Sequence, residues 1–390
     1  MGRDVARTSP GVQTAFVGFA LFLLIGATAA MFGPTIPAFR STFHISATAA
    51  GLLLGGHFAG SLLGTMSPSF LPERLRAPRT LTAVATLCFA LGCLTIGSAP
   101  SWPVPVAGAG IEGVGWGGIV IVFNALFVSG FGSRSPTMLI LLNAVYGLGA
   151  ILGPTGVALL ATGGFRLPFL LVTAVALAVL PFGLVLPGNA KVSAPSGHPT
   201  PSASVMLRPL AVFIVAFFLY GGLEAGIGAW EPTHLIATGL SVAGAAMVTS
   251  VFWASFTLAR LVAAPLALIV NPERLVLGCL AVVVFLALAT RVDAITPAAY
   301  TGCGLFLGPV FPLAVVWSGR TIRASQRVTS FVISGDLLGG AVLPPFLGQL
   351  VMSVGIQALP TAFAVLAAGS FSILLAVQLM GRRLIAISTS

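Results

Sequence analysis

The chain has 390 residues, of which 57% are hydrophobic and only 7% are charged, and its mean hydropathy is +1.08. Soluble domains carry about 25% charged residues, so the composition excludes a water-soluble protein and predicts an integral membrane protein. The formal net charge is +10. A membrane protein acquires such an excess because Arg and Lys collect in cytoplasmic loops, so the charge gives no reason to expect nucleic-acid binding.

Twelve apolar stretches are long enough to cross a bilayer, which takes about 20 residues in a helix. The first stretch has full length and no small-residue cleavage site follows a short core, so it is predicted to be a transmembrane helix and not a signal peptide. In chain order the predicted helices cover residues 13–38, 46–70, 80–99, 103–128, 136–162, 166–187, 209–236, 241–269, 274–291, 296–318, 328–352 and 357–380.

One long polar break interrupts this series. Residues 188–208 are rich in Pro and Ser and have no hydrophobic period, which is the composition of a flexible linker. The break divides the helices six and six. We therefore predict an N-terminal six-helix bundle over residues 1–187, a cytoplasmic linker over 188–208 and a C-terminal six-helix bundle over 209–390.

The basic residues predict the orientation of the chain. With the N-terminus inside, most of the 18 basic residues fall in cytoplasmic segments, and the opposite side holds only Arg40, Arg166 and Arg291. This asymmetry places both termini and the linker in the cytoplasm. The predicted location is the inner (plasma) membrane, crossed many times.

Four short motifs recur in the same order in the two halves, which predicts a duplicated six-helix unit. Two parallel six-helix halves around a central path are the architecture of the major facilitator class, so the expected fold is all-α, with twelve transmembrane helices in two pseudo-symmetric bundles. The motif pairs are FGPT at 32–35 with WEPT at 230–233, PERL at 72–75 and 272–275, GVGWGG at 113–118 with GCGLFLG at 302–308, and GAILGP at 149–154 with GAVLPP at 340–345.

Longer stretches carry a more specific resemblance. They are FGPT in the first helix, GVGWGGIVIVFN in the fourth, YGLGAILGP in the fifth, SVFWASFTLARL in the eighth, GLFLGPVFPLAV in the tenth and FVISGDLLGGAVLPPFLG in the eleventh. Together they resemble the fucose–galactose–glucose:proton-symporter branch of the major facilitator superfamily, and within it the sodium-dependent glucose transporter-like group. The resemblance implies sugar uptake with protons or sodium.

The chain departs from that branch at the expected coupling carboxylates. The resemblance implies an acidic residue in the fourth helix, three or four residues before Asn124, and a further one in the first helix of proton-coupled members. Here the fourth helix has Gly118, Val120 and Val122, and the first helix has no acidic residue. The loop after the second helix also lacks the Gly and Asp of the general gate motif and keeps only Arg74, Arg76 and Arg79. Coupling is therefore expected in the C-terminal half.

Carboxylates inside apolar helices are the candidate coupling groups, since an ionised side chain there costs roughly 2.5–3.5 kcal/mol on insertion scales. At 1.5 Å per residue, Glu224 lies near the midplane and Asp336 somewhat inside it. Glu112 lies in the outer third, where it could simply face the outer interface. Glu231 lies near the outer rim, before Pro232, where it could cap a break in the helix. For Glu224 the alternative is a protonated structural carboxyl between helices, and for Asp336 it is a pair with a nearby Arg.

Histidine is the residue type suited to proton relay at neutral pH, so His57 could relay protons with Glu224, or it could be a hydrogen-bonded packing residue. Arg260, near the inner end of the eighth helix, suits a cytoplasmic gate or a snorkelling side chain. The remaining candidates for substrate binding offer either an amide for a hydroxyl-rich ligand or an aromatic face for a sugar ring. They are Asn124, Asn143, Trp116, Tyr146, Tyr220 and Trp253; for each aromatic residue the alternative is packing or anchoring at the membrane interface.

No enzyme is indicated, because the sequence has no Walker motif, His/Cys cluster or Ser/His/Asp arrangement, and the four cysteines lie in apolar runs without zinc or disulfide spacing. We expect no cofactor or metal beyond a coupling proton or sodium ion. The expected partners are a small-molecule solute and the lipid bilayer, with the protein a monomer. The leading interpretation is a secondary active transporter for a small polar, sugar-like solute, working by alternating access. The alternatives are a proton-driven exporter of drugs or metabolites and a non-transporting membrane receptor or scaffold.

Overall fold

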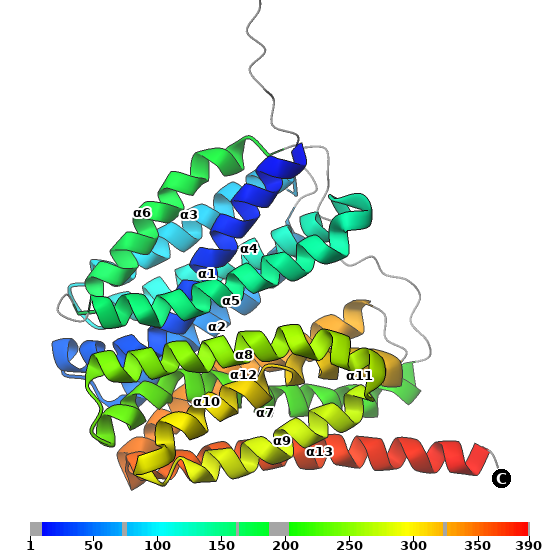
Figure 1. Ribbon diagram of the computed structural model, residues 1–390. Helices are drawn as coiled ribbons and strands as arrows, with labels where there is room; N and C mark the ends of the chain where they lie inside the picture. The colour runs from blue at the N-terminus through cyan, green and yellow to red at the C-terminus, as the bar shows by residue number, and fades with distance from the viewer. Residues whose placement is uncertain (1–9, 72–75, 161–163, 187–202, 323–325, 389–390) are drawn as a thin grey trace, which may run out of the picture.

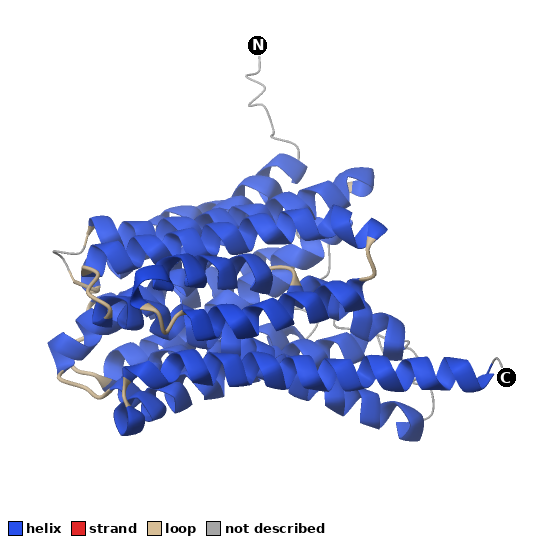
Figure 2. Ribbon diagram, turned by 60° about the horizontal axis from the view of Figure 1, so that its bottom comes forward, coloured by secondary structure: helices blue, strands red, loops and turns tan. Residues whose placement is uncertain are grey.

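The computed structural model describes residues 10–71, 76–160, 164–186, 203–322 and 326–388. The described residues form α-helices joined by short turns and contain no strand (Figure 2). One PERL copy, at 72–75, and most of the predicted linker lie outside them.

The described residues of the first half form six α-helices. They are α1 (Pro10–Phe43), α2 (Ala47–Phe70), α3 (Pro78–Gly97), α4 (Pro103–Ser129), α5 (Ser135–Leu159) and α6 (Arg166–Leu184). The helices of the second half are α7 (Ala203–Ala237), α8 (Val242–Ile269), α9 (Pro272–Ala289), α10 (Thr296–Leu307), α11 (Val310–Ile322), α12 (Gln326–Val354) and α13 (Leu359–Ser388). Among the described residues, twelve segments are long and apolar enough to span a membrane, as predicted.

The tenth span differs from the prediction of one helix over 296–318. It consists of α10 and α11, which meet at Gly308 and Pro309; we call these two residues the α10–α11 break. A proline has no N–H to donate to the carbonyl four residues earlier. Pro309 therefore leaves the carbonyl of Leu305 without its helical donor, and Pro312 does the same to Gly308.

Local sequence explains where several helices begin. Proline occupies the first or second position of α3, α4, α5, α9 and α10, where its missing N–H costs nothing. Ser46 and Ser241 cap α2 and α8, the second helix of each half, by accepting from the N–H groups of Ala49 and Gly244. α7 begins at Ala203, six residues before the predicted start at 209.

The two halves pack their helices in the same way. In the first half α4 packs on α2 and α3, α1 packs on α5, and α3 packs on α6. In the second half α10 packs on α8 and α9, α7 on α12, and α9 on α13. Glycines permit the closest approaches: a Cβ built on Gly60 of α2 would lie 2.1 Å from the carbonyl oxygen of Gly110 in α4. The predicted pair of pseudo-symmetric six-helix bundles is confirmed.

In the described residues the halves meet mainly where α2 packs on α12, α5 on α8, and α1 on α7. Thr155 Oγ1 of α5 lies 3.0 Å from Ser250 Oγ of α8, and Thr48 of α2 donates to Gln349 of α12 over 2.8 Å. These contacts lie toward the end of the molecule at which α1, α5, α7 and α12 finish, the outer end of the predicted topology. Figure 1 shows the two sets of helices close together there and diverging toward the end where α1 begins.

Candidate functional site

The seventh span places a tyrosine and a glutamate on one face of α7. Tyr220 and Glu224 are four residues apart, the spacing at which helical side chains meet. The Tyr220 hydroxyl lies 2.6 Å from Glu224 Oε2. On the other side of the carboxylate, Arg260 of α8 brings Nη2 to 3.9 Å from Glu224 Oε1. Each oxygen of Glu224 thus faces a different donor.

Arg260 also holds the break in the tenth span. Its Nε donates to the carbonyl oxygen of Gly308 over 3.2 Å, the carbonyl that Pro312 deprives of a helical donor. The guanidinium lies 4.3 Å from the ring centre of Phe256 and 5.9 Å from that of Phe311, within range of a cation–π interaction. The structure places Arg260 against Glu224, where we had predicted a gate or a snorkelling side chain.

Asp336 completes the group from α12. The helix packs so closely on α7 that a Cβ built on Gly221 would lie 2.6 Å from Asp336 Oδ1. That oxygen is buried and has no hydrogen-bond partner among the described residues. Asp336 is near enough to Glu224 and Arg260 to interact electrostatically with both. We call Tyr220, Glu224, Arg260 and Asp336 the Glu224 cluster.

A second polar contact lies inside the first half. His57 Nδ1 of α2 is 2.6 Å from Glu112 Oε2 of α4, with the side chains 3% and 0% exposed. The rings of Phe32, Phe58 and Trp116 surround the imidazole at 5.1–5.7 Å between centres. His57 therefore contacts Glu112 and not Glu224, the partner we predicted. Glu112 does not face the outer interface, because it is fully buried.

Tyr146 of α5 lies between these two polar groups. Its ring packs edge-on against Trp116, 6.3 Å between centres, and Trp116 in turn donates to the carbonyl oxygen of Ile25 over 3.3 Å. Tyr146 is also near enough to Glu112, Glu224 and Arg260 to interact electrostatically with all three. The predicted residues Trp116, Tyr146 and His57 thus lead from the first half toward the Glu224 cluster.

Glu231 lies apart from that cluster, in the packing of α7 against α8 and α10. It is fully buried, and neither of its oxygens reaches hydrogen-bond geometry with a partner among the described residues; Thr249 is a neighbouring hydroxyl. His234, one turn on, meets the Tyr300 hydroxyl at 2.7 Å. α7 continues through Pro232 to Ala237. Glu231 therefore caps no helix break and does not lie at an exposed rim.

The two predicted asparagines lie outside both polar groups. Asn124 donates to the carbonyl oxygen of Val120 over 2.8 Å, and Asn143 donates to that of Leu139 over 2.9 Å. Each amide nitrogen thus bonds to its own helix. Asn143 is exposed and Asn124 is half-buried.

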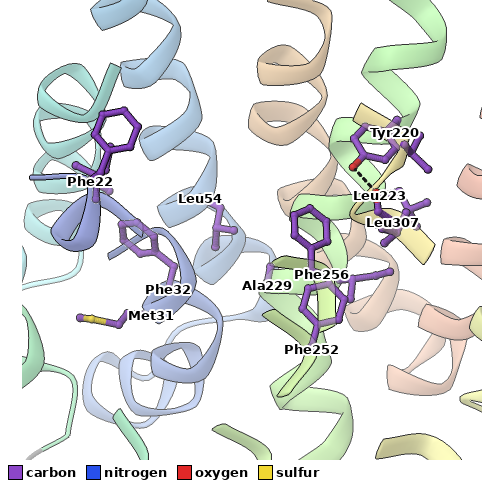
Figure 3. Packing of buried hydrophobic residues seen from close by; sticks show 14 of the residues in the cluster. Phe22, Met31, Phe32, Leu54, Tyr220, Leu223, Ala229, Phe252, Phe256 and Leu307 are labelled. Carbon is purple, nitrogen blue, oxygen red and sulfur yellow. Dashed lines mark hydrogen bonds between the residues drawn. The ribbon is translucent and has the colours of Figure 1, made fainter. Parts of the chain in front are cut away.

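Aromatic side chains surround the Glu224 cluster on the side of the second half. Trp253 packs edge-on against Phe252 and Phe256, 5.1 and 5.2 Å between centres, and its indole N–H has no partner among the described residues. Phe311 of α11 lies 6.5 Å from Tyr220. Figure 3 shows Phe252, Phe256 and Tyr220 near Leu307. We call Trp253, Phe256 and Phe311 the aromatic wall.

A cavity of about 530 Å³ opens elsewhere, between α12 and α13, with Arg291 and Thr361 at one end. None of the predicted site residues lines it. No carboxylate lines this cavity, whereas the Glu224 cluster contains an ion pair between α7 and α8 within electrostatic range of Asp336 in α12. The cluster is therefore the better candidate for the functional site.

Sequence reasoning missed the association of Arg260 with Glu224 and the roles of Phe256, Phe311 and the carbonyls at the break. Arg260 carried a usable signal, since a lone cation in an apolar helix is a candidate functional residue with a partner. The prolines at 309 and 312 carried another. Within the described ranges, no group of three or more His, Cys, Asp or Glu side chains could hold a metal ion, and the four cysteines are unpaired.

Residues 18–301 match the Major Facilitator Superfamily, and the chain belongs to that family of membrane transporters, which are not enzymes. It is 26% identical over 350 residues to the uncharacterized MFS-type transporter YcaD of Escherichia fergusonii, covering 84% of this chain and 86% of that one. It is 22% identical over 383 residues to sodium-dependent glucose transporter 1A of Mus musculus, covering 85% and 88%. Its fold resembles the crystal structure of the nucleoside transporter NupG, with a TM-score of 0.72 and 15% identity over 96% of this chain and 99% of that one.

Proposed function

We propose that this secondary transporter moves a small polar, sugar-like solute across the inner membrane by alternating access, as a monomer with both termini in the cytoplasm, and that protonation of Glu224 couples the movement to the proton gradient. The observation that carries the proposal is the Glu224 cluster, in which a carboxylate from α7 faces an arginine from α8 and lies within electrostatic range of a second carboxylate from α12.

The charges in the cluster favour the uptake of one cation. Glu224 and Asp336 together with Arg260 leave one negative charge when both carboxylates are ionised. An uncompensated charge in a low-dielectric site costs several kcal/mol. One bound cation makes the cluster neutral, so loading and release of a cation would change the stability of the helix contacts that the cluster spans.

The surroundings of Glu224 suit a proton better than a sodium ion. Hard cations are bound by several oxygen ligands, whereas one Glu224 oxygen faces the Tyr220 hydroxyl and the other faces a guanidinium. The positive charge of Arg260 would repel a metal ion at this place. A proton needs no ligand cage and binds directly to one carboxylate oxygen.

The aromatic wall supports a sugar-like solute, because aromatic faces pack on ring carbons. The similarity to a glucose transporter and the shared fold with a nucleoside transporter agree with this class, since glucose and nucleosides both carry a hydroxyl-bearing ring. They also support the resemblance to the sugar-symporter branch of the family.

The aromatic wall also favours a second candidate. Trp253, Phe256 and Phe311 offer apolar faces beside a single carboxylate–arginine contact, and such a surface suits a lipophilic cation. A proton-driven exporter of drugs or metabolites is therefore the alternative function.

The test is transport by the purified protein in liposomes under an imposed pH or sodium gradient. Labelled hexoses, nucleosides and lipophilic cations are offered separately. We expect hexose or nucleoside accumulation driven by the pH gradient and collapsed by a protonophore. Accumulation that follows sodium alone would replace the proton in the proposal, and extrusion of lipophilic cations without sugar transport would favour the exporter.

The first prediction concerns the variant Glu224→Gln. The substitution removes the titratable group but keeps a side chain of the same size, so uphill accumulation should fall at least tenfold while solute exchange at equal concentrations persists. The matched control is Glu273→Gln, which changes a glutamate at the start of α9, bonded to Gln378 and remote from the cluster; its transport should equal that of the wild type. Normal uphill transport by the Glu224 variant would remove Glu224 from the coupling mechanism.

A further inference from the structure

The hydroxyl of Tyr220 lies within hydrogen-bond distance of two acceptors at once. Glu224 Oε2 is 2.6 Å away, and the carbonyl oxygen of Leu307 is 3.1 Å away (dashed line in Figure 3). A phenol has one proton and can donate it to only one acceptor at a time. The acceptor that receives it depends on whether Glu224 is an acceptor or a donor.

Leu307 is the last residue of α10, directly before the α10–α11 break. Pro309 and Pro312 remove the helical donors of the Leu305 and Gly308 carbonyls, and side chains from other helices donate to carbonyls at the break. Arg260 donates to Gly308 while its Nη2 faces Glu224. Both neighbours of the Glu224 carboxylate are therefore also bonded to the main chain at the break.

Two hydrogen-bond arrangements follow. When Glu224 is ionised it can only accept, so Tyr220 donates to Oε2 and the Leu307 carbonyl loses that donor. When Glu224 is protonated its O–H donates to the Tyr220 oxygen, and the phenol proton turns to Leu307. Only the proton taken up by Glu224 is gained; Tyr220 keeps its own proton throughout, and no covalent bond of the tyrosine changes.

We propose that Tyr220 is a positioning residue that transmits the protonation state of Glu224 to the α10–α11 break, tying α7 to α10 when Glu224 is protonated and releasing the break when it is ionised. This inference rests on the proposed role of Glu224 in coupling. The other ionisable groups that face the pair are Arg260 from α8, Asp336 from α12 and Tyr146 from α5.

The break connects this switch to the solute path. Phe311, one residue into α11 from Val310, packs on Tyr220 and on Phe217 at 6.5 and 5.7 Å between ring centres and belongs to the aromatic wall. The presence or absence of the Tyr220 hydrogen bond to Leu307 therefore changes how firmly Phe311 is held beside the bound solute. The Tyr220 hydroxyl thus links the protonation of Glu224 to the shape of the aromatic wall.

Hydrogen exchange at the break tests the proposal, measured by mass spectrometry on the full-length protein in liposomes. Glu224→Gln imitates the protonated carboxyl, because its amide oxygen faces Arg260 and its NH2 then faces Tyr220. With both proteins at the same alkaline pH, we expect the backbone amides between Gly304 and Leu313 to exchange about fivefold more slowly in Glu224→Gln than in the wild type, which is the effect of one additional net hydrogen bond. No slowing would overturn the proposal, and this comparison needs no change at Tyr220.

Tyr220→Phe supplies the second comparison. The Glu224→Gln substitution should have no effect on exchange at the break in the Tyr220→Phe background, and the pH profile of uphill transport should flatten while solute exchange persists. Tyr300→Phe is the matched control, since it removes the buried hydroxyl that meets His234, and the slowing by Glu224→Gln should survive in it.

The two proposals fail separately. Suppose that Glu224→Gln abolishes uphill transport and slows hydrogen exchange at the break equally with and without the Tyr220 hydroxyl. That result would overturn the role of Tyr220 and leave coupling through Glu224 intact. Unchanged uphill transport in Glu224→Gln would instead overturn the coupling role.

Discussion

At the scale of single residues, the contact between His57 and Glu112 puts a charged or shared-proton hydrogen bond into apolar surroundings. Removing one partner leaves the other buried without its bond, which costs about 3–5 kcal/mol for buried ion pairs. We predict that His57→Ala and Glu112→Ala each destabilise the protein by that amount, and that the double variant costs clearly less than the two together. The measurement is a double-mutant cycle of unfolding free energies in mixed micelles; additive effects would show that the contact contributes nothing specific.

Individual candidates at this scale could be predicted from the sequence, but their partners could not. Glu224 and Asp336 are candidates because carboxylates are costly in apolar helices. In the structure Glu224 pairs with Arg260, and Asp336 lies within electrostatic range of both. His57 and Glu112 are 55 positions apart, and no spacing rule connects α2 with α4 at such a distance. The roles of the site residues stay predictions until transport is measured.

At the scale of helices, the crossing of α1 and α7 depends on the absence of a side chain. A Cβ built on Gly33 would lie 1.9 Å from the carbonyl oxygen of Gly228. We predict that Gly33→Ala destabilises this arrangement by about 1–3 kcal/mol, the usual cost of overpacking. Gly156→Ala is the control, because nothing lies within 4 Å of its added Cβ and alanine favours a helix by up to about 1 kcal/mol. Thermal unfolding compares the two, and equal effects would contradict the close crossing.

The positions of the helices could be predicted closely from the lengths of the apolar runs, and the exceptions have identifiable causes. A hydropathy scale scores side chains and contains no information about a missing backbone N–H. The prolines at 309 and 312 therefore divide a span that hydropathy predicts to be one continuous helix. α7 extends back to Ala203 because the helix continues through Arg208 and Pro209, which interrupt the apolar run. An apolar-length criterion assigns the residues before such an interruption to the linker.

At the scale of the whole molecule, the two halves touch at one end. Alternating access requires that they separate there. We predict that cysteines at Thr155 and Ser250, whose hydroxyl oxygens are 3.0 Å apart, form a disulfide on oxidation and stop transport in a variant without the four native cysteines. A reductant should restore transport, and each single-cysteine variant should keep it under oxidation. Normal transport by the fully crosslinked protein would contradict separation at this contact.

The duplication and the number of spans could be predicted because repeats and apolar length are local properties of the chain. The end at which the halves touch could not. The pairs of helices inside each half bury the same residues whichever end is closed, so the hydrophobic pattern does not distinguish the arrangements.

The glycine crossing of α1 and α7 affects how easily the two halves move from one arrangement to the other. Because Gly33 and Gly228 meet through main chain, no side chain has to leave a pocket or change its rotamer when the two helices part. Such a contact contributes little to the barrier and little to the preference for either arrangement. The populations of the two arrangements then respond to small differences in ligand affinity, since about 1.4 kcal/mol changes their ratio tenfold. A single proton or one bound solute is enough to supply such a difference.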